Sequence, residues 1–206
     1  LLAAQIANTG AQGTLSILSN GPRDLPERHR NLRDTIGWSY NLLSDSEKQL
    51  FAHLSVFVGG SDLEAAGWVW SDDLSKQPDS GATHPSPHTL DGIASLVDKS
   101  LLRLDTSDNT GCGTRVTMLD TIREYACERL AESGKEESVR RAHAAYFLSV
   151  AETTEVKLTG SDQKEWLACL ERDHDNLRAA LRAAQEWADA ETLARMTGAL
   201  WRFWWL

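Results

Sequence analysis

Two short apolar runs, SLLRL at residues 100–104 and RVTML at residues 115–119, interrupt a chain whose other periodic segments are helical. Between them lies the polar stretch DTSDNTGCGT, in which Gly111 and Gly113 suit a turn. Two apolar runs joined by a glycine-containing turn are typical of a β-hairpin. The sequence therefore predicts one hairpin within a mainly helical protein.

Helical signals precede this hairpin. Ile36 and Tyr40 lie four residues apart, the spacing of one helix face, within a predicted helix at residues 31–43. Ser44–Glu47 and Ser61–Glu64 each match the capping box that opens a helix. A further helix is predicted at residues 90–98, after a proline-rich loop at residues 71–89. Helices followed by a hairpin are the arrangement of a winged helix, with the hairpin as its wing.

From residue 120 onward the pattern is helical throughout. Helices are predicted from Asp120 to about Ser133, around residues 139–150, over a long region at 163–187, and from about Glu191 to the end. Short joints between such helices are typical of a helical solenoid, although a clean repeat of about 34 residues is missing. The fold class predicted is mainly α, a winged helix followed by a TPR-like helical array.

The ends of the chain suggest a piece of a longer protein. It begins without Met inside a helical pattern, and it ends on the aromatic cluster LWRFWWL. An exposed apolar cluster usually marks a missing partner surface. We therefore expect a helical linker at residues 1–30, a winged-helix domain at residues 31–133, and the start of the array at residues 134–206.

Composition narrows the classes of function. The net charge is −9, so the overall field does not favour nucleic acid or an anionic membrane. No run of 18 apolar residues is present, so no membrane span is expected. The three cysteines, Cys112, Cys127 and Cys169, are odd in number and widely spaced, which favours free thiols in a reducing cytoplasm over a disulfide framework.

Several long strings resemble one protein family. LRDTIGWSYNLLSDSEKQLFAHLSVFVGG and LDGIASLVDKSLLRL with RVTMLDTIREYACERLAESG are similar to the winged-helix domain of NB-ARC-type signalling ATPases, the STAND class. ERDHDNLRAALRAA and GALWRFWWL resemble the helical array that follows it in bacterial multidomain regulators. Those regulators often carry a LuxR-type or SARP-type DNA-binding domain, or a nucleotide cyclase. The resemblance covers roughly residues 20–206.

The resemblance implies a regulatory fragment in signal transduction and transcription regulation. It would couple the nucleotide state of an upstream ATPase domain to a helical sensor that takes a protein or small-molecule effector. In the family, a Met-His-Asp motif at the junction of strand and helix faces the nucleotide domain, and its histidine reaches the phosphates of ADP. Met118 and Asp120 match the motif, whereas Leu119 stands in the histidine position and cannot donate a hydrogen bond.

A purely structural interpretation of this junction is also open. Met118 could pack under the wing, and Asp120 could cap the helix that follows through its carboxylate. The two interpretations are compatible.

A basic cluster lies near the start of the chain. Arg23, Arg28, Arg30 and Arg33 fall within RDLPERHRNLR, which is net +2. This segment is either a solvated linker or a surface that faces the nucleotide phosphates or an acidic part of the ATPase domain.

The sequence offers no catalytic machinery of its own. Its single Gly-Lys pair, Gly134-Lys135, is followed by Glu rather than Ser or Thr, so no phosphate-binding loop is formed. We expect no enzyme activity, cofactor or metal in this fragment, and binding of ATP or ADP with Mg²⁺ by the full-length protein. His84 and His88 have metal-ligand spacing only in a helix, which Pro85 and Pro87 disfavour.

DNA binding is the alternative function, through the winged helix and with the helical tail as a dimerisation element. Base readout requires Arg, Lys, Asn or Gln on the helix that enters the major groove. The helix before the hairpin, LDGIASLVD, offers Asp91 and Asp98 instead. We therefore expect the partners to be an ATPase domain in cis and an effector, rather than DNA or a membrane.

Overall fold

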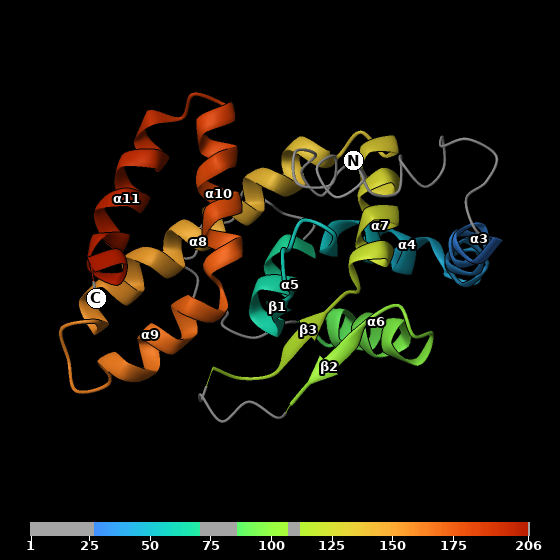
Figure 1. Cartoon of the computed structure of the whole chain (residues 1–206), viewed down its shortest axis with the longest axis horizontal. Coiled ribbons are helices and arrows are strands. Elements are labelled where there is room, and N and C mark those ends of the chain that lie inside the picture. The colour runs from blue at the N-terminus through green and yellow to red at the C-terminus, as the bar shows by residue number, and fades with distance from the viewer. Residues whose placement is uncertain (1–26, 71–85, 107–111, 206) are drawn as a thin grey trace.

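The computed structural model describes residues 27–70, 86–106 and 112–205 (Figure 1). Most of the predicted linker at residues 1–30, most of the proline-rich loop and the tip of the predicted hairpin lie outside these ranges. The described part is mainly helical with one small sheet, which confirms the predicted fold class. None of its helices is long and apolar enough to cross a membrane.

The first two described helices are α3 (Glu27–Asn41) and α4 (Asp45–Leu54). Ser44 caps α4 as predicted, because its hydroxyl accepts from the Glu47 N–H while the Glu47 carboxylate accepts from the Ser44 N–H at 2.7 Å. This reciprocal capping fixes the turn between the helices. It also holds the apolar face of α4 toward the core.

A three-stranded antiparallel sheet follows, in the order β1-β3-β2. Strand β1 (Ser61–Asp62) precedes helices α5 (Leu63–Trp70) and α6 (Pro87–Asp98), and strands β2 (Arg103–Asp105) and β3 (Arg115–Thr117) form the hairpin. The order helix, strand, helix, helix, hairpin is winged-helix-like, as predicted.

Strand β1 was not predicted, and the capping box at Ser61–Glu64 is wrong in detail. Ser61 pairs with Val116 in the sheet, and the Asp62 carboxylate instead accepts from the Ala65 N–H at 2.6 Å. Two residues are too few to show alternating polarity, so only the pairing with β3 makes this segment a strand.

Four helices complete the described chain after α7 (Asp120–Glu132): α8 (Glu136–Lys157), α9 (Gln163–Arg172), α10 (His174–Glu186) and α11 (Ala190–Trp205). Helices α10 and α11 lie side by side across α8 (Figure 1). The predicted single helical region at 163–187 is broken at Asp173, where α9 ends and α10 begins.

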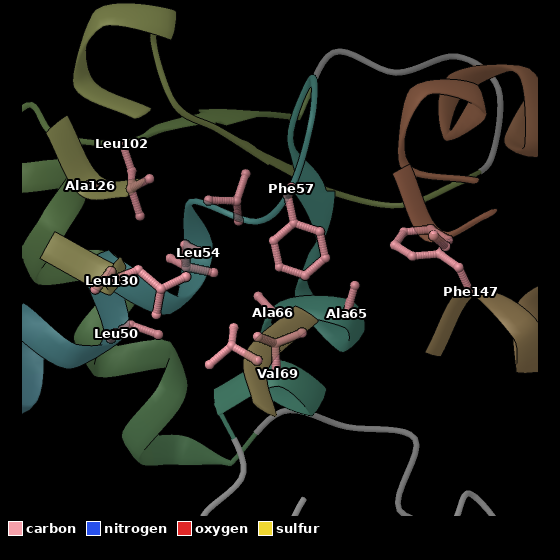
Figure 2. Packing of buried hydrophobic residues seen from close by; sticks show 14 of the residues in the cluster. Leu50, Leu54, Phe57, Ala65, Ala66, Val69, Leu102, Ala126, Leu130 and Phe147 are labelled. Atoms are coloured by element: carbon pink, nitrogen blue, oxygen red, sulfur yellow. The ribbon is translucent and has the colours of Figure 1, made fainter. Parts of the chain in front are cut away.

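One continuous apolar core joins the winged-helix-like part to the following helices. Leu50 of α4 and Val69 of α5 are almost completely buried, and Leu130 of α7 packs in the same cluster (Figure 2). Phe147 of α8 extends the cluster toward α10 and α11. Burial of this kind is the main favourable term in folding, so the two parts stabilise each other.

Candidate functional site

Strand β3 ends at an exposed corner, the junction between strand and helix. Leu119 occupies the N-cap position of α7 and is 47% exposed, and Met118 is partly buried against the core. The prediction that Asp120 caps this helix is wrong: Asp120 is the first residue inside α7, and the cap position carries no side-chain hydrogen bond. An acidic side chain there still favours the helix, because it lies near the positive end of the helix dipole.

A shallow cleft of about 440 Å³ opens beside this corner. Leu104 of β2, 43% exposed, and Leu119 contribute to its wall. The other lining residues are Val97, Ser100, Leu101, Leu102, Arg103, Thr117 and Ile122. We call this surface the open corner. It presents apolar side chains to solvent at the position where the sequence predicts contact with an upstream domain.

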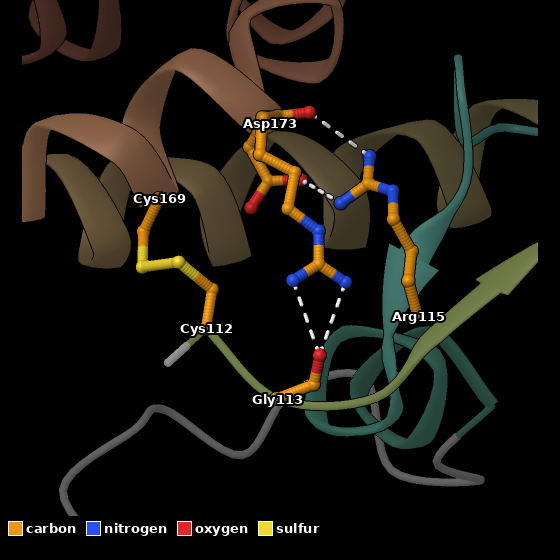
Figure 3. Close-up of a disulfide and its surroundings, with 6 residues drawn as sticks. Cys112, Gly113, Arg115, Cys169 and Asp173 are labelled. Atoms are coloured by element: carbon orange, nitrogen blue, oxygen red, sulfur yellow. Dashed lines mark hydrogen bonds and ion pairs between the residues drawn. A yellow bond between two sulfur atoms is a disulfide. The ribbon is translucent and has the colours of Figure 1, made fainter. Parts of the chain in front are cut away.

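The other end of β3 is closed by a network of polar contacts (Figure 3). The Arg115 guanidinium donates to the Asp173 carboxylate at 2.8 Å, to the carbonyls of Gly59 and Gly60 at 3.0 Å each, and to that of Arg172 at 3.1 Å. Its side chain is only 9% exposed. Burying a guanidinium is tolerated only when its donors are satisfied, and this residue meets that condition.

Asn176 of α10 extends this network, which we call the seam. Its carboxamide oxygen accepts from the Val58 N–H at 2.7 Å, and its nitrogen donates to the Gly60 carbonyl at 2.8 Å. Tyr146 of α8 donates to both carboxylate oxygens of Asp62 at 3.3 Å. Burial raises the pKa of the Asp62 carboxyl and of the Tyr146 hydroxyl. The seam thus ties β1 and β3 to α8 and α10.

His143 of α8 lies beside the seam and packs against two aromatic rings. Its ring centroid is 5.2 Å from that of Phe57 and 4.7 Å from that of Phe147. Burial in this apolar setting lowers the pKa of His143 to about 4. The imidazole is therefore neutral at physiological pH.

A disulfide joins Cys112 to Cys169 next to the seam, with a Cα–Cα distance of 5.6 Å (Figure 3). The prediction of three free thiols is therefore wrong for this pair, and only Cys127 is free. Arg172 reinforces the same contact, because its guanidinium donates two hydrogen bonds of 3.1 Å to the Gly113 carbonyl. Spacing along the sequence could not reveal a pair that tertiary packing brings together.

The exposed face of α6 is unlike a DNA-reading helix. His88, Asp91, Ala94 and Asp98 are exposed on it. Lys99, which follows the helix, donates to Glu47 at 2.8 Å and to Ser95 at 2.6 Å. The hydrogen bonds from Lys99 and Ser95 lower the pKa of Glu47 to about 2. The nearest basic group is thus held by an internal contact.

The predicted arginine cluster is only partly described. Arg33 of α3 forms a two-point ion pair with Glu128 of α7, at 3.1 and 2.5 Å, and its guanidinium lies 5.7 Å from the centre of the Tyr125 ring. This contact ties α3 to α7. Arg28 and Arg30 belong to α3, and Arg23 lies outside the described residues.

Two expectations about ligands can be compared with the side chains present. Leu119 offers no donor to a phosphate. Within residues 27–70, 86–106 and 112–205, no group of three or more His, Cys, Asp or Glu side chains could hold a metal ion. His88 stands in the first turn of α6, and its predicted spacing partner His84 is outside that part.

Sequence reasoning missed the residues of the seam. Arg115 opens a strand predicted to be apolar, and an arginine there could have indicated a buried ion pair. The polar run ERDHDN at residues 171–176 lies inside a predicted helix and could have indicated a break. Neither feature shows that Arg115 pairs with Asp173.

The chain is similar to several mycobacterial proteins. It is 34% identical over 177 residues to a predicted HTH-type transcriptional regulator of Mycobacterium tuberculosis and to one of Mycobacterium bovis, covering 86% of this chain and 18% of each relative. An uncharacterised protein of Mycobacterium tuberculosis is 37% identical over 106 residues, which is 51% of this chain and 24% of that protein. No family model matches the chain, and no solved structure matches it significantly.

The first two of these relatives are named as regulators of transcription. The chain spans about a fifth of the length of the first two, so it corresponds to one segment of a much longer protein in them.

Proposed function

We propose that this chain is the coupling module of a STAND-type regulator, which links an upstream ATPase domain to a helical sensor in the cytoplasm. The winged-helix-like order of elements, the resemblance of its long strings to that class, and the similarity to named transcriptional regulators support this proposal. In this proposal the upstream domain holds the nucleotide, and the module acts through contacts between domains.

The observation that most supports this proposal is the open corner. Leu104 and Leu119 expose apolar side chains around a cleft at the end of β3, beside the acidic start of α7. Exposed apolar surface of this kind marks a docking site. The corner also coincides with Met118, Leu119 and Asp120, which stand where the resembled family carries the Met-His-Asp motif that faces its nucleotide domain. Leu119 departs from that motif. We therefore assign the open corner as the surface on which that domain docks.

The seam gives the docked domain a mechanical connection to the array. Arg115 and the open corner lie at the two ends of the same three-residue strand. Arg115 is held by Asp173 at the start of α10. A displacement of β3 by the docked domain is thereby passed to α8 and α10. The regulator would then shift between two populations, with the module moving as one body.

Hydrogen exchange on a protein that joins this chain to its ATPase domain tests the docking. Amides at residues 102–104 and 117–122 should exchange more slowly there than in the isolated chain. Replacing Leu104 and Leu119 together by Asp should restore fast exchange and weaken docking by about tenfold or more, because charge is placed in an apolar contact. Val156→Asp is the matched control, since Val156 is 74% exposed on α8, away from the corner.

Unchanged exchange at the corner in the longer protein would refute the docking. Equal effects of the corner variant and the Val156 control would do the same, because they would indicate a general response to added charge.

DNA binding by this module is the second candidate, favoured by the winged-helix-like fold and by the HTH in the relatives' names. The acidic exposed face of α6 speaks against it. A gel shift with duplex DNA at low salt separates the two candidates, because phosphate contacts give binding that falls steeply with added salt. Salt-dependent binding that is lost in a Lys99→Ala or Arg103→Ala variant would favour DNA binding over domain docking.

A further inference from the structure

The disulfide Cys112–Cys169 anchors α9, the helix of the array with the fewest buried residues. Of the residues in α9, only Leu170 is fully buried, and Trp166 and Leu167 pack partly against the core. Cys169 and Cys112 are each partly buried. A short helix with so little buried surface belongs to the part of a fold that opens at low free energy.

We propose that Cys112–Cys169 is a reversible thiol–disulfide exchange site, at which a dithiol reductant controls whether α9 and the base of the wing are fastened together. The bond joins elements 57 residues apart in sequence. It lies outside the apolar core, which is built from other residues. Opening it therefore frees a local contact and leaves the core intact.

The chemistry needs only a dithiol as co-reactant. One thiolate of the reductant attacks a sulfur of the pair, the S–S bond breaks, and a mixed disulfide forms while the other cysteine leaves as a thiolate. The second thiol of the reductant then displaces the remaining cysteine. Two electrons and two protons pass to the protein, which gains two thiols, and the reductant becomes a cyclic disulfide. A disulfide such as oxidised glutathione reverses the exchange.

Two polar contacts near the disulfide remain after reduction, so breaking the bond loosens this region only in part. In the reduced protein, Arg172 still donates to the Gly113 carbonyl, and Arg115 still pairs with Asp173. The first of these is exposed to solvent and is weakened by competition with water. The second is buried and keeps β3 on α10. Reduction thus loosens the contact between α9 and residues 112–114 and leaves the seam, including the bond from Arg115 to the Arg172 carbonyl, in place.

This inference is independent of the docking proposed above, because neither cysteine lines the open corner. It does rest on the proposed location of the chain in the cytoplasm. Disulfides in reducing compartments are mostly redox-sensing or catalytic rather than permanent.

The test uses the 206-residue chain under native conditions. Treatment with millimolar dithiothreitol at neutral pH should raise the number of alkylatable thiols from one to three, and oxidised glutathione should return it to one. Reduction should speed amide exchange at residues 163–172 by about tenfold or more and leave α4 and α7 protected. It should also lower Tm by roughly 10 °C, from the loss of a cross-link across 57 residues.

Two variants complete the design. Cys112→Ser with Cys169→Ser should reproduce the fast exchange of the reduced state and no longer respond to dithiothreitol. Cys127→Ser is the matched control, because its thiol belongs to α7 and donates to the Ser55 carbonyl, so the response should persist.

Three results would overturn the inference, and the wild-type chain suffices for all of them. They are a bond that resists the dithiol without denaturant, reduction that leaves exchange in α9 unchanged, and reduction that also exposes α4 and α7. The first two indicate a merely structural bond, and the third a cross-link required by the whole fold.

Discussion

The two ends of strand β3 are held in opposite ways. At its start, Arg115 is buried and bonded to three backbone carbonyls and one carboxylate. At its far end, Leu119 and the neighbouring Leu104 are about half exposed around a cleft. Three residues of strand thus separate a saturated polar contact from an apolar surface without a covering element among the described residues.

This difference shows which end is a joint within the fold and which is available to another domain. A buried charge has to find its partners inside the structure, because leaving it unpaired is strongly unfavourable. Exposed leucines carry no such requirement, so a fold tolerates them until a partner covers them. Substitutions at the two ends should therefore differ sharply in their effect on stability.

The largest effect is expected for Arg115→Ala. It leaves Asp173 half-buried without its cation and removes the donors to the Gly59 and Gly60 carbonyls. We expect a loss of about 3–5 kcal/mol in the free energy of unfolding, measured by urea denaturation. Arg141→Ala, in an exposed pair with Glu137, is the control and should lose less than about 1 kcal/mol. Equal losses would mean that the seam is no stronger than a surface ion pair.

The second effect concerns pH and His143. Its pKa is lowered from 6.5 to about 4 in the fold, so between these values the unfolded chain takes up a proton that the folded chain does not. Stability should therefore fall as pH decreases from 6.5 to about 4, by roughly 3 kcal/mol in total, and this term changes no further below that range. Urea titrations across this range measure the slope.

His143→Gln should remove most of that slope. Glu47 gives an independent reference, because its pKa is lowered from 4.5 to about 2, and the stability it contributes is lost as pH falls through that lower window. Glu47→Gln should therefore leave the slope above pH 4.5 intact. A wild-type slope that survives in His143→Gln would assign the pH dependence to another group.

A third prediction compares two neighbouring glycines. A Cβ at Gly60 would lie 2.4 Å from the Val116 carbonyl oxygen, whereas a Cβ at Gly59 would meet nothing within 4 Å. Both have positive φ, +93° at Gly60 and +74° at Gly59. Gly59→Ala should therefore lose only about 1 kcal/mol from backbone strain, and Gly60→Ala about 2–3 kcal/mol because β1 must also move from β3. Thermal unfolding of both variants measures how much the close approach of Gly60 to the Val116 carbonyl contributes to stability.

The smallest effect is expected at the open corner. Leu119→Ala should change the free energy of unfolding by no more than about 0.5 kcal/mol, since nearly half of its surface stays in contact with water in the fold. Leu102→Ala, at a side chain only 3% exposed, should lose about 3 kcal/mol. A large loss at Leu119 would show that the corner is part of the core and unavailable for docking.

Much of the fold could be predicted from local sequence patterns. The capping box at Ser44–Glu47 is confirmed, because it depends on residues three positions apart. The hairpin is confirmed as β2 and β3, although its strands are shorter than the apolar runs that predicted it. Strand β1 escaped prediction because two residues carry no period of their own.

The candidate site divides in the same way. The sequence predicted that Met118, Leu119 and Asp120, at the strand-to-helix junction, face an upstream domain, and that role stays a prediction; the cleft formed with Leu104 was not predicted. Within the same junction, the capping role predicted for Asp120 was wrong by one position, an error that local propensity alone cannot prevent.

The sequence by itself determined the start of α4, the position of the hairpin and the mainly helical character of the chain, because caps, glycines and helical spacing act over a few residues. Only the tertiary structure decided that Arg115 meets Asp173 and that Cys112 meets Cys169, across 58 and 57 residues. Such pairs depend on how whole helices pack against the sheet. No property of either residue alone specifies its partner, which is why the joint between wing and array became visible only in the folded chain.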